Sequence, residues 1–161
     1  MVPTVEIHGE WFRCVSLRRD PLSAEGSRLR GGRLNHRGEP ALYLAGTPTL
    51  AVAENLRLGS MFGVDHFPPR LLVTIEVSLS RVVDLTLQTT RAACGIAETN
   101  LTDAWQPTAP ATHLQRLAAK LIESGIEGIL YPSAIEPSAA NLAVFMRSVA
   151  SSGSLRVVGE D

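Results

Sequence analysis

Apolar and polar residues alternate in several short stretches of the chain, and this period of two predicts β-strands. The clearest stretch is "RLLVTIEVSL", residues 70–79, where one face of an extended chain carries Leu71, Val73, Ile75 and Val77. Looser patterns predict further strands at residues 11–17, 40–45, 81–85, 128–133, 141–146 and 155–158. Strands therefore make up most of the predicted elements.

Helical spacing is restricted to a few segments. Thr47 and Pro48 are typical of a helix N-cap and a first helical position, and the helix that follows is predicted to run to about Leu58. Residues 113–124 place their apolar side chains on one face of a helix, and a short helix is expected near Arg91. Strands separated by a few irregularly spaced helices predict a mixed α+β domain.

Length and charge narrow the class of protein. The 161 residues suffice for one domain with a core, and no repeat or linker divides them. The net charge of −1 argues against bulk electrostatic binding to nucleic acid or to an anionic membrane, so we expect no direct DNA binding. The sequence shows neither a signal peptide nor an apolar run long enough to span a bilayer, which predicts a cytoplasmic protein.

The cysteines and histidines do not form a metal-binding pattern. Cys14 and Cys94 lie far apart and are interpreted as buried thiols in a reducing compartment. The histidines are scattered, without a paired-histidine helix motif or an acidic cluster around them, at His8, His36, His66 and His113. We therefore predict no metal site.

Arginine is the unusual part of the composition, because only Lys120 among the 15 basic residues is a lysine. Seven arginines fall in the first quarter of the chain: Arg13, Arg18, Arg19, Arg28, Arg30, Arg33 and Arg37. The planar fork of arginine matches phosphate and carboxylate, which suggests local oxyanion recognition, although a solvated surface explains most of the seven. Gly31 and Gly32 precede Arg33, and paired glycines suit a loop packed against a ligand as well as ordinary turns. Residues 18–40 are expected to be loop with at most one short strand.

Three further side chains are candidates for chemistry. Tyr43 stands on a strand face otherwise lined by small residues, which leaves room for a flat ring, although core or edge packing is the commoner use of an aromatic. Glu54 shares a helix face with apolar residues, so it either reaches the helix edge or is held there for a purpose. Ser133 follows a strand end, where side chains often face a cleft, but it lacks a GxSxG context and is interpreted as a turn residue rather than a nucleophile.

Taken in order, these motifs resemble the RES-domain family. The most specific part is "GGRLN" followed by "ALYLAGTPTLAVAE", supported by "GIEGILYPSA" and "NLAVF", and the resemblance begins at about Phe12. Carried over position by position, the family's catalytic arginine, tyrosine, glutamate and serine are Arg33, Tyr43, Glu54 and Ser133. Further matching positions, expected to contact a dinucleotide, are Arg13, Asn35 and Asn141. Leu34 stands where the family usually has an aromatic residue.

The resemblance implies an ADP-ribosyltransferase-like fold, with mixed, mostly antiparallel sheets and flanking helices, in a single RES domain over residues 1–161. It also implies the toxin of a bacterial RES–Xre type II toxin–antitoxin pair, an enzyme that cleaves the nicotinamide–ribose bond of NAD+. We expect water or phosphate as the acceptor, so that cellular NAD+ is depleted and growth arrests. The alternative is a mono-ADP-ribosyltransferase that uses NAD+ to modify a cellular protein. A non-enzymatic RNA- or protein-binding module is less favoured, because the charge is near neutral and no aromatic residues are interleaved with the arginines.

The family's residues then acquire expected roles. Glu54 would stabilise the positive charge that develops on the ribose, or hydrogen-bond the ribose itself. Arg33 would hold the pyrophosphate or a neighbouring phosphate oxygen with its fork. Tyr43 would stack on the nicotinamide, and Ser133 would orient the ribose or Glu54. NAD+ is thus the substrate, no metal is required, and an Xre-like antitoxin is expected to cover the active site.

Overall fold

Six strands of the described chain form one mixed sheet, and five of them close into a ring. The computed structural model describes residues 2–61, 70–152 and 154–159. The strands are β1 (Val5–Ser16), β2 (Ala41–Ala45), β3 (Arg70–Asp84), β4 (Gly128–Pro132), β5 (Ala140–Phe145) and β6 (Ser154–Val157). Pairing runs from β1 through β2, β5, β4 and β3 back to β1, and β6 adds to β3. Among these pairs only β3–β4 is parallel, so the predicted α+β fold with mostly antiparallel strands is confirmed.

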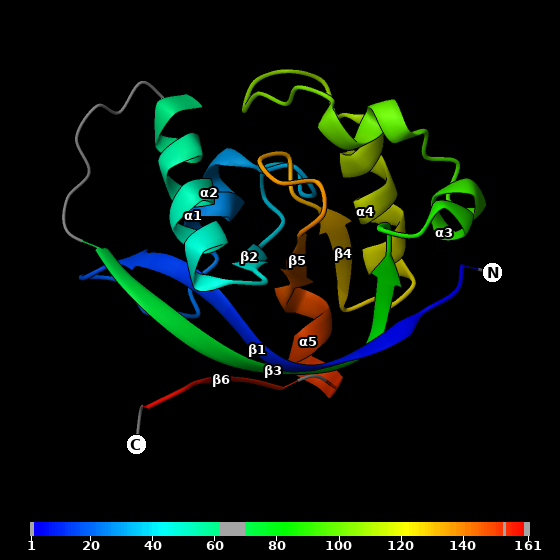
Figure 1. Cartoon of the computed structure of the whole chain (residues 1–161). Helices are drawn as coiled ribbons and strands as arrows, with labels where there is room; N and C mark the ends of the chain where they lie inside the picture. The colour runs from blue at the N-terminus through cyan, green and yellow to red at the C-terminus, as the bar shows by residue number, and fades with distance from the viewer. Residues whose placement is uncertain (1, 62–69, 153, 160–161) are drawn as a thin grey trace.

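The helices flank this sheet. They are α1 (Glu25–Arg30), α2 (Pro48–Met61), α3 (Gln88–Ala93), the 3₁₀ helix η1 (Glu98–Thr102), α4 (His113–Glu123) and α5 (Met146–Ser152). Figure 1 shows α1 and α2 on one side of the molecule, α3 and α4 on the other, and the long β1–β3 ribbon curving beneath them. The connection from β3 to β4 contains α3, η1 and α4, because parallel neighbours need a long crossover.

Two helices begin where the sequence predicts, because side chains cap their free backbone N–H groups. Thr47 Oγ1 accepts a hydrogen bond from the Leu50 N–H at 3.1 Å at the start of α2. Thr112 Oγ1 accepts from the Gln115 N–H at 3.2 Å, and Gln115 Oε1 accepts from the Thr112 N–H at 3.0 Å, so α4 begins with a reciprocal capping box. The short helix expected near Arg91 is α3.

The two strands predicted at residues 70–79 and 81–85 are in fact one continuous strand, β3. The polar residues Ser80 and Arg81 suggest a break between them, but the fully buried Glu127 supports the chain there. Glu127 Oε1 accepts hydrogen bonds from the Ser80 N–H, the Ser80 hydroxyl and the Arg81 N–H, each at 2.9 Å. The prediction of a break is wrong because this support comes from far along the chain.

Two helices and several boundaries also differ from the prediction. Residues 18–40, expected to be loop with at most one short strand, contain α1, which ends at Arg30 and is followed by Gly31 with φ +80°. The strand predicted at residues 141–146 ends at Phe145, where α5 begins, and α2 continues past Leu58. Both missed helices are short, at 6 and 7 residues, so helical periodicity has too few turns to reveal them.

Successive residues of β2 point to opposite faces of the sheet, as the alternation predicts. Leu42 and Leu44 are buried in one apolar cluster with residues of β3 and β5, whereas Ala41 and Tyr43 pack on the other face with residues of α4. On that second face the register places Ala143 of β5 opposite Tyr43. The small neighbour leaves space beside the Tyr43 ring, and this face of β2, β5 and β4 carries the candidate site.

Candidate active site

A cavity of about 520 Å³ is lined by residues of α1, α2 and all of the strands β1 to β5. Its volume falls within the roughly 300–1,000 Å³ of small-molecule sites. Five of the predicted site residues line it: Arg13, Arg33, Tyr43, Glu54 and Asn141. The other two, Asn35 and Ser133, lie behind the wall and contact residues that line it. The structure therefore brings together residues that are widely separated in sequence.

The Glu54 carboxylate is held at the cavity wall by two donors from other elements. The Ser133 hydroxyl, just after β4, donates to Glu54 Oε1 at 2.7 Å, and Asn141 Nδ2, on β5, donates to the same oxygen at 2.9 Å. Both donors are buried, while Glu54 is half-buried. Two such hydrogen bonds complement the negative charge and fix the direction of the carboxylate. The sequence left open whether Glu54 reaches the helix edge or is held in place, and the structure shows a carboxylate held by two side chains.

The Ser133 hydroxyl is directed at Glu54 and not at the cavity. Its Oγ accepts hydrogen bonds from the Ile135 N–H at 3.1 Å and from the Glu136 N–H at 3.2 Å. These two donors occupy the lone pairs of the hydroxyl, so its single hydrogen points to Glu54. Ser133 is also only 2% exposed. This geometry suits a positioning residue and not a nucleophile.

Gly32 allows the loop before β2 to pack directly on Tyr43. A Cβ at Gly32 would lie 2.6 Å from Tyr43 Oη and 2.8 Å from Asn35 Oδ1, closer than real Cβ atoms approach. The Tyr43 hydroxyl accepts a hydrogen bond from the Leu34 N–H at 2.9 Å and donates one to Asn35 Oδ1 at 2.5 Å. Burial raises the pKa of the Tyr43 hydroxyl, so it keeps the proton that it donates. The tyrosine therefore holds the loop with its hydroxyl and faces the cavity with its ring.

Asn35 serves this loop and not the cavity. Its Nδ2 donates to the carbonyl oxygens of Ser27 at 2.9 Å and Glu39 at 2.8 Å, and its Oδ1 is occupied by Tyr43. A direct contact with a dinucleotide is not supported by this position and stays an untested prediction. Leu34, at the place of the family's usual aromatic, is fully buried in the core and offers no stacking surface.

A residue that sequence analysis missed holds the same loop from α4. Gln115 Nε2 donates to the Gly32 carbonyl at 2.7 Å, and Gln115 is 4% exposed. The sequence signal at Thr112 and Gln115 indicates a capping box, which is present. Nothing local indicates that the same amide reaches a loop 83 residues earlier.

Arg33 extends from this loop to the cavity wall. Its Nη1 donates to the Leu101 carbonyl of η1 at 3.0 Å, which uses one of the five N–H groups of the guanidinium. Burial raises the pKa values of Tyr43 and Tyr131, and the nearby positive charge of Arg33 partly opposes this rise. Tyr131 and Trp105 also line the cavity, and neither was singled out from the sequence. Tyr131 stands directly opposite Asn141 in the β4–β5 pairing, and a strand alternation carried through "GILYP" could have placed it on this face.

Positive charge is concentrated around the cavity. Four of the seven early arginines line it: Arg13, Arg19, Arg30 and Arg33. Arg13 Nη1 donates to the carbonyl oxygens of Pro21 at 2.9 Å and Ser23 at 3.0 Å, which anchors the segment between β1 and α1. Burial, followed by the charge of Arg70, lowers the pKa of Arg13 to about 10, so the guanidinium remains charged at neutral pH. The cavity is therefore suited to an anionic ligand.

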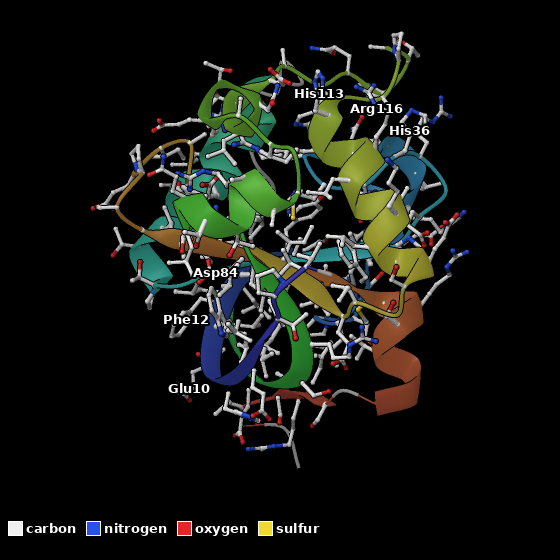
Figure 2. The ribbon with its side chains drawn as sticks, turned by 90° about the vertical axis from the view of Figure 1, so that its right-hand side faces the viewer. Glu10, Phe12, His36, Asp84, His113 and Arg116 are labelled. Atoms are coloured by element: carbon white, nitrogen blue, oxygen red, sulfur yellow. The ribbon has the colours of Figure 1, made fainter. Side chains whose placement is uncertain are left out.

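The histidines that the structure describes do not contribute to this site. Figure 2 shows His36, His113 and Arg116 at the outer surface near α4. None of the described histidines lines the cavity. His66 lies outside the described residues. Within residues 2–61, 70–152 and 154–159, no group of three or more His, Cys, Asp or Glu side chains could hold a metal ion. The helices of that same part of the chain include none that is long and apolar enough to cross a membrane.

Comparison with known proteins identifies the family. The RES-domain family model matches residues 9–158. The chain belongs to the RES-domain family. The matched range contains all seven predicted site residues and the two residues, Gly32 and Gln115, that hold the loop before β2. The candidate site is thus built entirely within the RES domain.

Two relatives of this RES domain come from Mycobacterium tuberculosis. A probable NAD(+) phosphorylase of strain ATCC 25618 / H37Rv is 31% identical over 133 residues, which are 81% of this chain and 62% of that relative. The chain thus spans less than two thirds of the relative's length. One chain of the crystal structure of the MbcT–MbcA toxin–antitoxin complex matches with a TM-score of 0.75 and 23% identity, over 96% of this chain and 83% of that chain. This second match shows that the fold is shared.

Proposed function

We propose that this RES domain is the toxin of a toxin–antitoxin pair and consumes NAD+ by cleaving its nicotinamide–ribose bond. The observation that carries the proposal is the Glu54 carboxylate, fixed by Ser133 and Asn141 at the wall of a cavity that also contains Arg33 and Tyr43. The relative named as a probable NAD(+) phosphorylase supports the reaction, and the fold shared with a chain of a toxin–antitoxin complex supports the biological role. The likeness of the fold to that of ADP-ribosyltransferases belongs to the same proposal.

The cavity fits a dinucleotide in charge and in hydrogen-bonding groups. Four early arginines supply positive charge for a pyrophosphate, and Glu54, Tyr43 and Tyr131 line the same cavity. Asn141 lines the same wall, where its Nδ2 donates to Glu54 Oε1 at 2.9 Å. A ligand that carries phosphates would pair with the arginine forks.

The arrangement suits cleavage of a glycosidic C–N bond. As nicotinamide departs, positive charge develops on the ribose, and a fixed carboxylate stabilises such charge better than mobile water does. Glu54 supplies that carboxylate, and Ser133 and Asn141 keep it in place. Arg33 binds phosphate oxygens, and the Tyr43 ring offers a flat surface to the nicotinamide. Because the groups are held before the substrate arrives, little reorganisation is needed during the reaction.

The acceptor of the ADP-ribosyl group is proposed to be phosphate or water. The relative named as a probable NAD(+) phosphorylase favours phosphate, and the arginines around the cavity suit an anionic acceptor. With phosphate, a phosphate oxygen forms the new bond to the ribose carbon as nicotinamide leaves with the electrons of the C–N bond, which gives ADP-ribose 1-phosphate. An Xre-like antitoxin that covers the cavity in a cytoplasmic complex completes the proposal.

The test is incubation of the purified protein with labelled NAD+, with and without phosphate, followed by separation of the products. The proposal predicts free ADP-ribose or its 1-phosphate and a loss of at least about 100-fold in Glu54→Gln, because the fixed charge is removed. Glu123→Gln, at an exposed position of α4, is the matched control and should keep wild-type activity. Label retained on a protein in lysate would instead indicate the transferase, and NAD+ unchanged in every condition would contradict the proposal.

A further inference from the structure

The cavity extends to the end of the β1–β3 ribbon, where Ser16 of β1 pairs with Arg70 of β3. Figure 1 shows this end of the ribbon on the side of α1 and α2. Arginines from three places line the cavity there: Arg13 on β1, Arg70 on β3 and Arg19 in the segment that follows β1. We call these three the ribbon arginines. They form a second concentration of positive charge, separate from the loop that carries Arg33.

Arg13 presents one edge of its guanidinium to this part of the cavity. Its Nη1 donates to the carbonyl oxygens of Pro21 and Ser23, whereas its Nε and Nη2 make no hydrogen bond to the residues that the structure describes. A guanidinium carries five N–H groups in one plane, so three donors remain and the anchored edge fixes their direction. Burial, and then the positive charge of Arg70, lowers the pKa of Arg13, so the two cations lie close enough to repel each other. An anion bound between them would relieve this repulsion.

The charge that lines the cavity exceeds the charge of a pyrophosphate. The described lining includes six arginines and the two carboxylates of Asp20 and Glu54. A pyrophosphate within a dinucleotide carries two negative charges, so a net positive charge of about two is left over when it binds. A phosphate monoester, which carries a charge of about −1.5 to −2 at neutral pH, matches that remainder. The six arginines are Arg13, Arg19, Arg30, Arg33, Arg57 and Arg70.

The sheet separates the ribbon arginines from Glu54. Asn141 of β5 binds Glu54, and β1 lies two strands away through the pairs Asn141–Ala45 and Ala45–Phe12. Neighbouring strands are about 4.8 Å apart, so the backbone at Arg13 lies roughly 10 Å from that at Asn141, and β3 is one strand farther. A phosphate that attacks the ribose carbon beside Glu54 must come within about 3.5 Å of that carbon. The ribbon arginines are thus better placed for the far end of a dinucleotide than for the acceptor.

We propose that the ribbon arginines bind a phosphate monoester on the adenosine end of the substrate, so that the enzyme cleaves NADP+ as well as NAD+. This inference rests on the proposed function. In NADP+ the additional phosphate is esterified to the 2′-hydroxyl of the adenosine ribose, on the other side of the pyrophosphate from the nicotinamide. The bond that breaks is the same: nicotinamide leaves with the electrons of the C–N bond, and an oxygen of phosphate or water bonds to the ribose carbon. The product is ADP-ribose or its 1-phosphate with the 2′-phosphate retained.

The experiment measures kcat/KM of the purified protein for NADP+ and for NAD+ and compares their ratio between variants. The wild type should cleave NADP+ at least as efficiently as NAD+. Arg70→Gln should lower the ratio by roughly 10-fold, because a charge-assisted contact with the 2′-phosphate is lost and NAD+ has no group at that position. Arg19→Gln, at an exposed position after β1, should lower the ratio in the same direction. Arg18→Gln removes the same charge at an exposed position outside the described lining and should keep the wild-type ratio.

Inorganic phosphate carries the same dianionic group, and a second measurement distinguishes it from the 2′-phosphate. The rate of NAD+ cleavage is followed while the concentration of inorganic phosphate is varied. If the ribbon arginines bind the 2′-phosphate, Arg70→Gln should keep the wild-type dependence on inorganic phosphate. If Arg70→Gln instead raises the phosphate concentration needed for half of the maximal rate and keeps the NADP+/NAD+ ratio, the ribbon arginines bind the acceptor and the assignment to NADP+ is overturned.

Binding is measured without cleavage by calorimetric titration with adenosine 2′,5′-bisphosphate and with 5′-AMP, after thermal unfolding has shown that each variant is folded. The wild type should bind the bisphosphate roughly 10-fold more tightly, and Arg70→Gln should lose this preference. The inference is overturned if the wild type cleaves NADP+ less efficiently than NAD+, or if folded Arg70→Gln and Arg19→Gln both keep the wild-type ratio. A wild type that leaves both dinucleotides intact refutes instead the proposed function, and the titration then still decides whether the ribbon arginines bind a 2′-phosphate.

Discussion

Replacing Gly32 by alanine tests the contact between Tyr43 and the loop before β2, which carries Arg33. The added Cβ would lie 2.6 Å from Tyr43 Oη, 2.9 Å from Tyr43 Cε2 and 2.8 Å from Asn35 Oδ1. Gly32 is not among the glycines with positive φ, so its backbone conformation accepts alanine without strain. The cost of the substitution is therefore steric, and either the Tyr43 ring or the loop must move.

The size of this cost follows from what has to move. Overpacking of a tightly packed position costs about 1–3 kcal/mol. Moving the ring also weakens the hydrogen bonds of the Tyr43 hydroxyl with Leu34 and Asn35, each of which contributes about 1 kcal/mol. We expect Gly32→Ala to lower the free energy of unfolding by about 2–4 kcal/mol. Arg33 is the next residue, and its displacement should reduce NAD+ cleavage by about 100-fold or more.

Urea unfolding monitored by tryptophan fluorescence, together with NAD+ cleavage by the folded variant, measures both effects. Gly26→Ala in α1 is the matched control for stability, because a Cβ there would meet only the end of the Arg30 side chain, at 3.2 Å. Alanine is favoured over glycine inside a helix by about 1 kcal/mol, so this variant should be as stable as the wild type or more so. If Gly32→Ala unfolds at the wild-type urea concentration and cleaves NAD+ at the wild-type rate, the argument for a tyrosine-held loop is refuted.

Three other predictions follow from the same contacts. Ser133→Ala should lower kcat for NAD+ by about 10-fold and leave KM nearly unchanged, because the carboxylate loses a positioning donor; unchanged kcat in steady-state kinetics would contradict this. Arg33→Lys should raise KM for NAD+ by about 10-fold, because the charge is kept and the fork is lost; a wild-type KM would argue against phosphate binding by the fork. Burial raises the pKa values of Tyr43 and Tyr131, so above pH 10 both hydroxyls keep their protons in the folded protein while they ionise in the unfolded chain. The free energy of unfolding should therefore be unaffected by them below pH 10. Above pH 10 it should fall by up to about 1.4 kcal/mol per pH unit for each tyrosine. The lowered pKa of Arg13 acts in the opposite direction over this range, so the diagnostic result is a shallower loss for Tyr131→Phe in urea unfolding between pH 9 and pH 11.

Strand positions were largely predictable from the sequence because burial on alternate faces imposes a period of two. β2 and β5 are found in this way, since Leu42 and Leu142 fall on one face of the sheet and Tyr43 and Ala143 on the other. The continuity of β3 was not predictable, because the buried carboxylate of Glu127 that supports it lies 46 and 47 residues away. Such long-range support leaves no local pattern.

The site was predictable to a different degree for each residue. Glu54 could be flagged from sequence alone as a carboxylate on an apolar helix face, but only the fold shows that Ser133 and Asn141 hold it. Asn35 and Gln115 illustrate the reverse case, because their amides are used to build the loop before β2. A polar residue near a motif can thus serve the ligand or the loop, and sequence spacing does not distinguish these.

The two halves of the site are placed relative to each other by three adjacent strands. Tyr43 on β2 holds the loop that carries Arg33, whereas Asn141 on β5 and Ser133 at the end of β4 hold Glu54. Because β2, β5 and β4 are hydrogen-bonded neighbours, the distance between the two halves is set by the sheet and not by the loops themselves. Sites supported in this way keep their geometry while the surrounding loops differ. Sequence change around the cavity mouth can therefore alter the proposed acceptor or partner without disturbing the groups that we propose to act on NAD+.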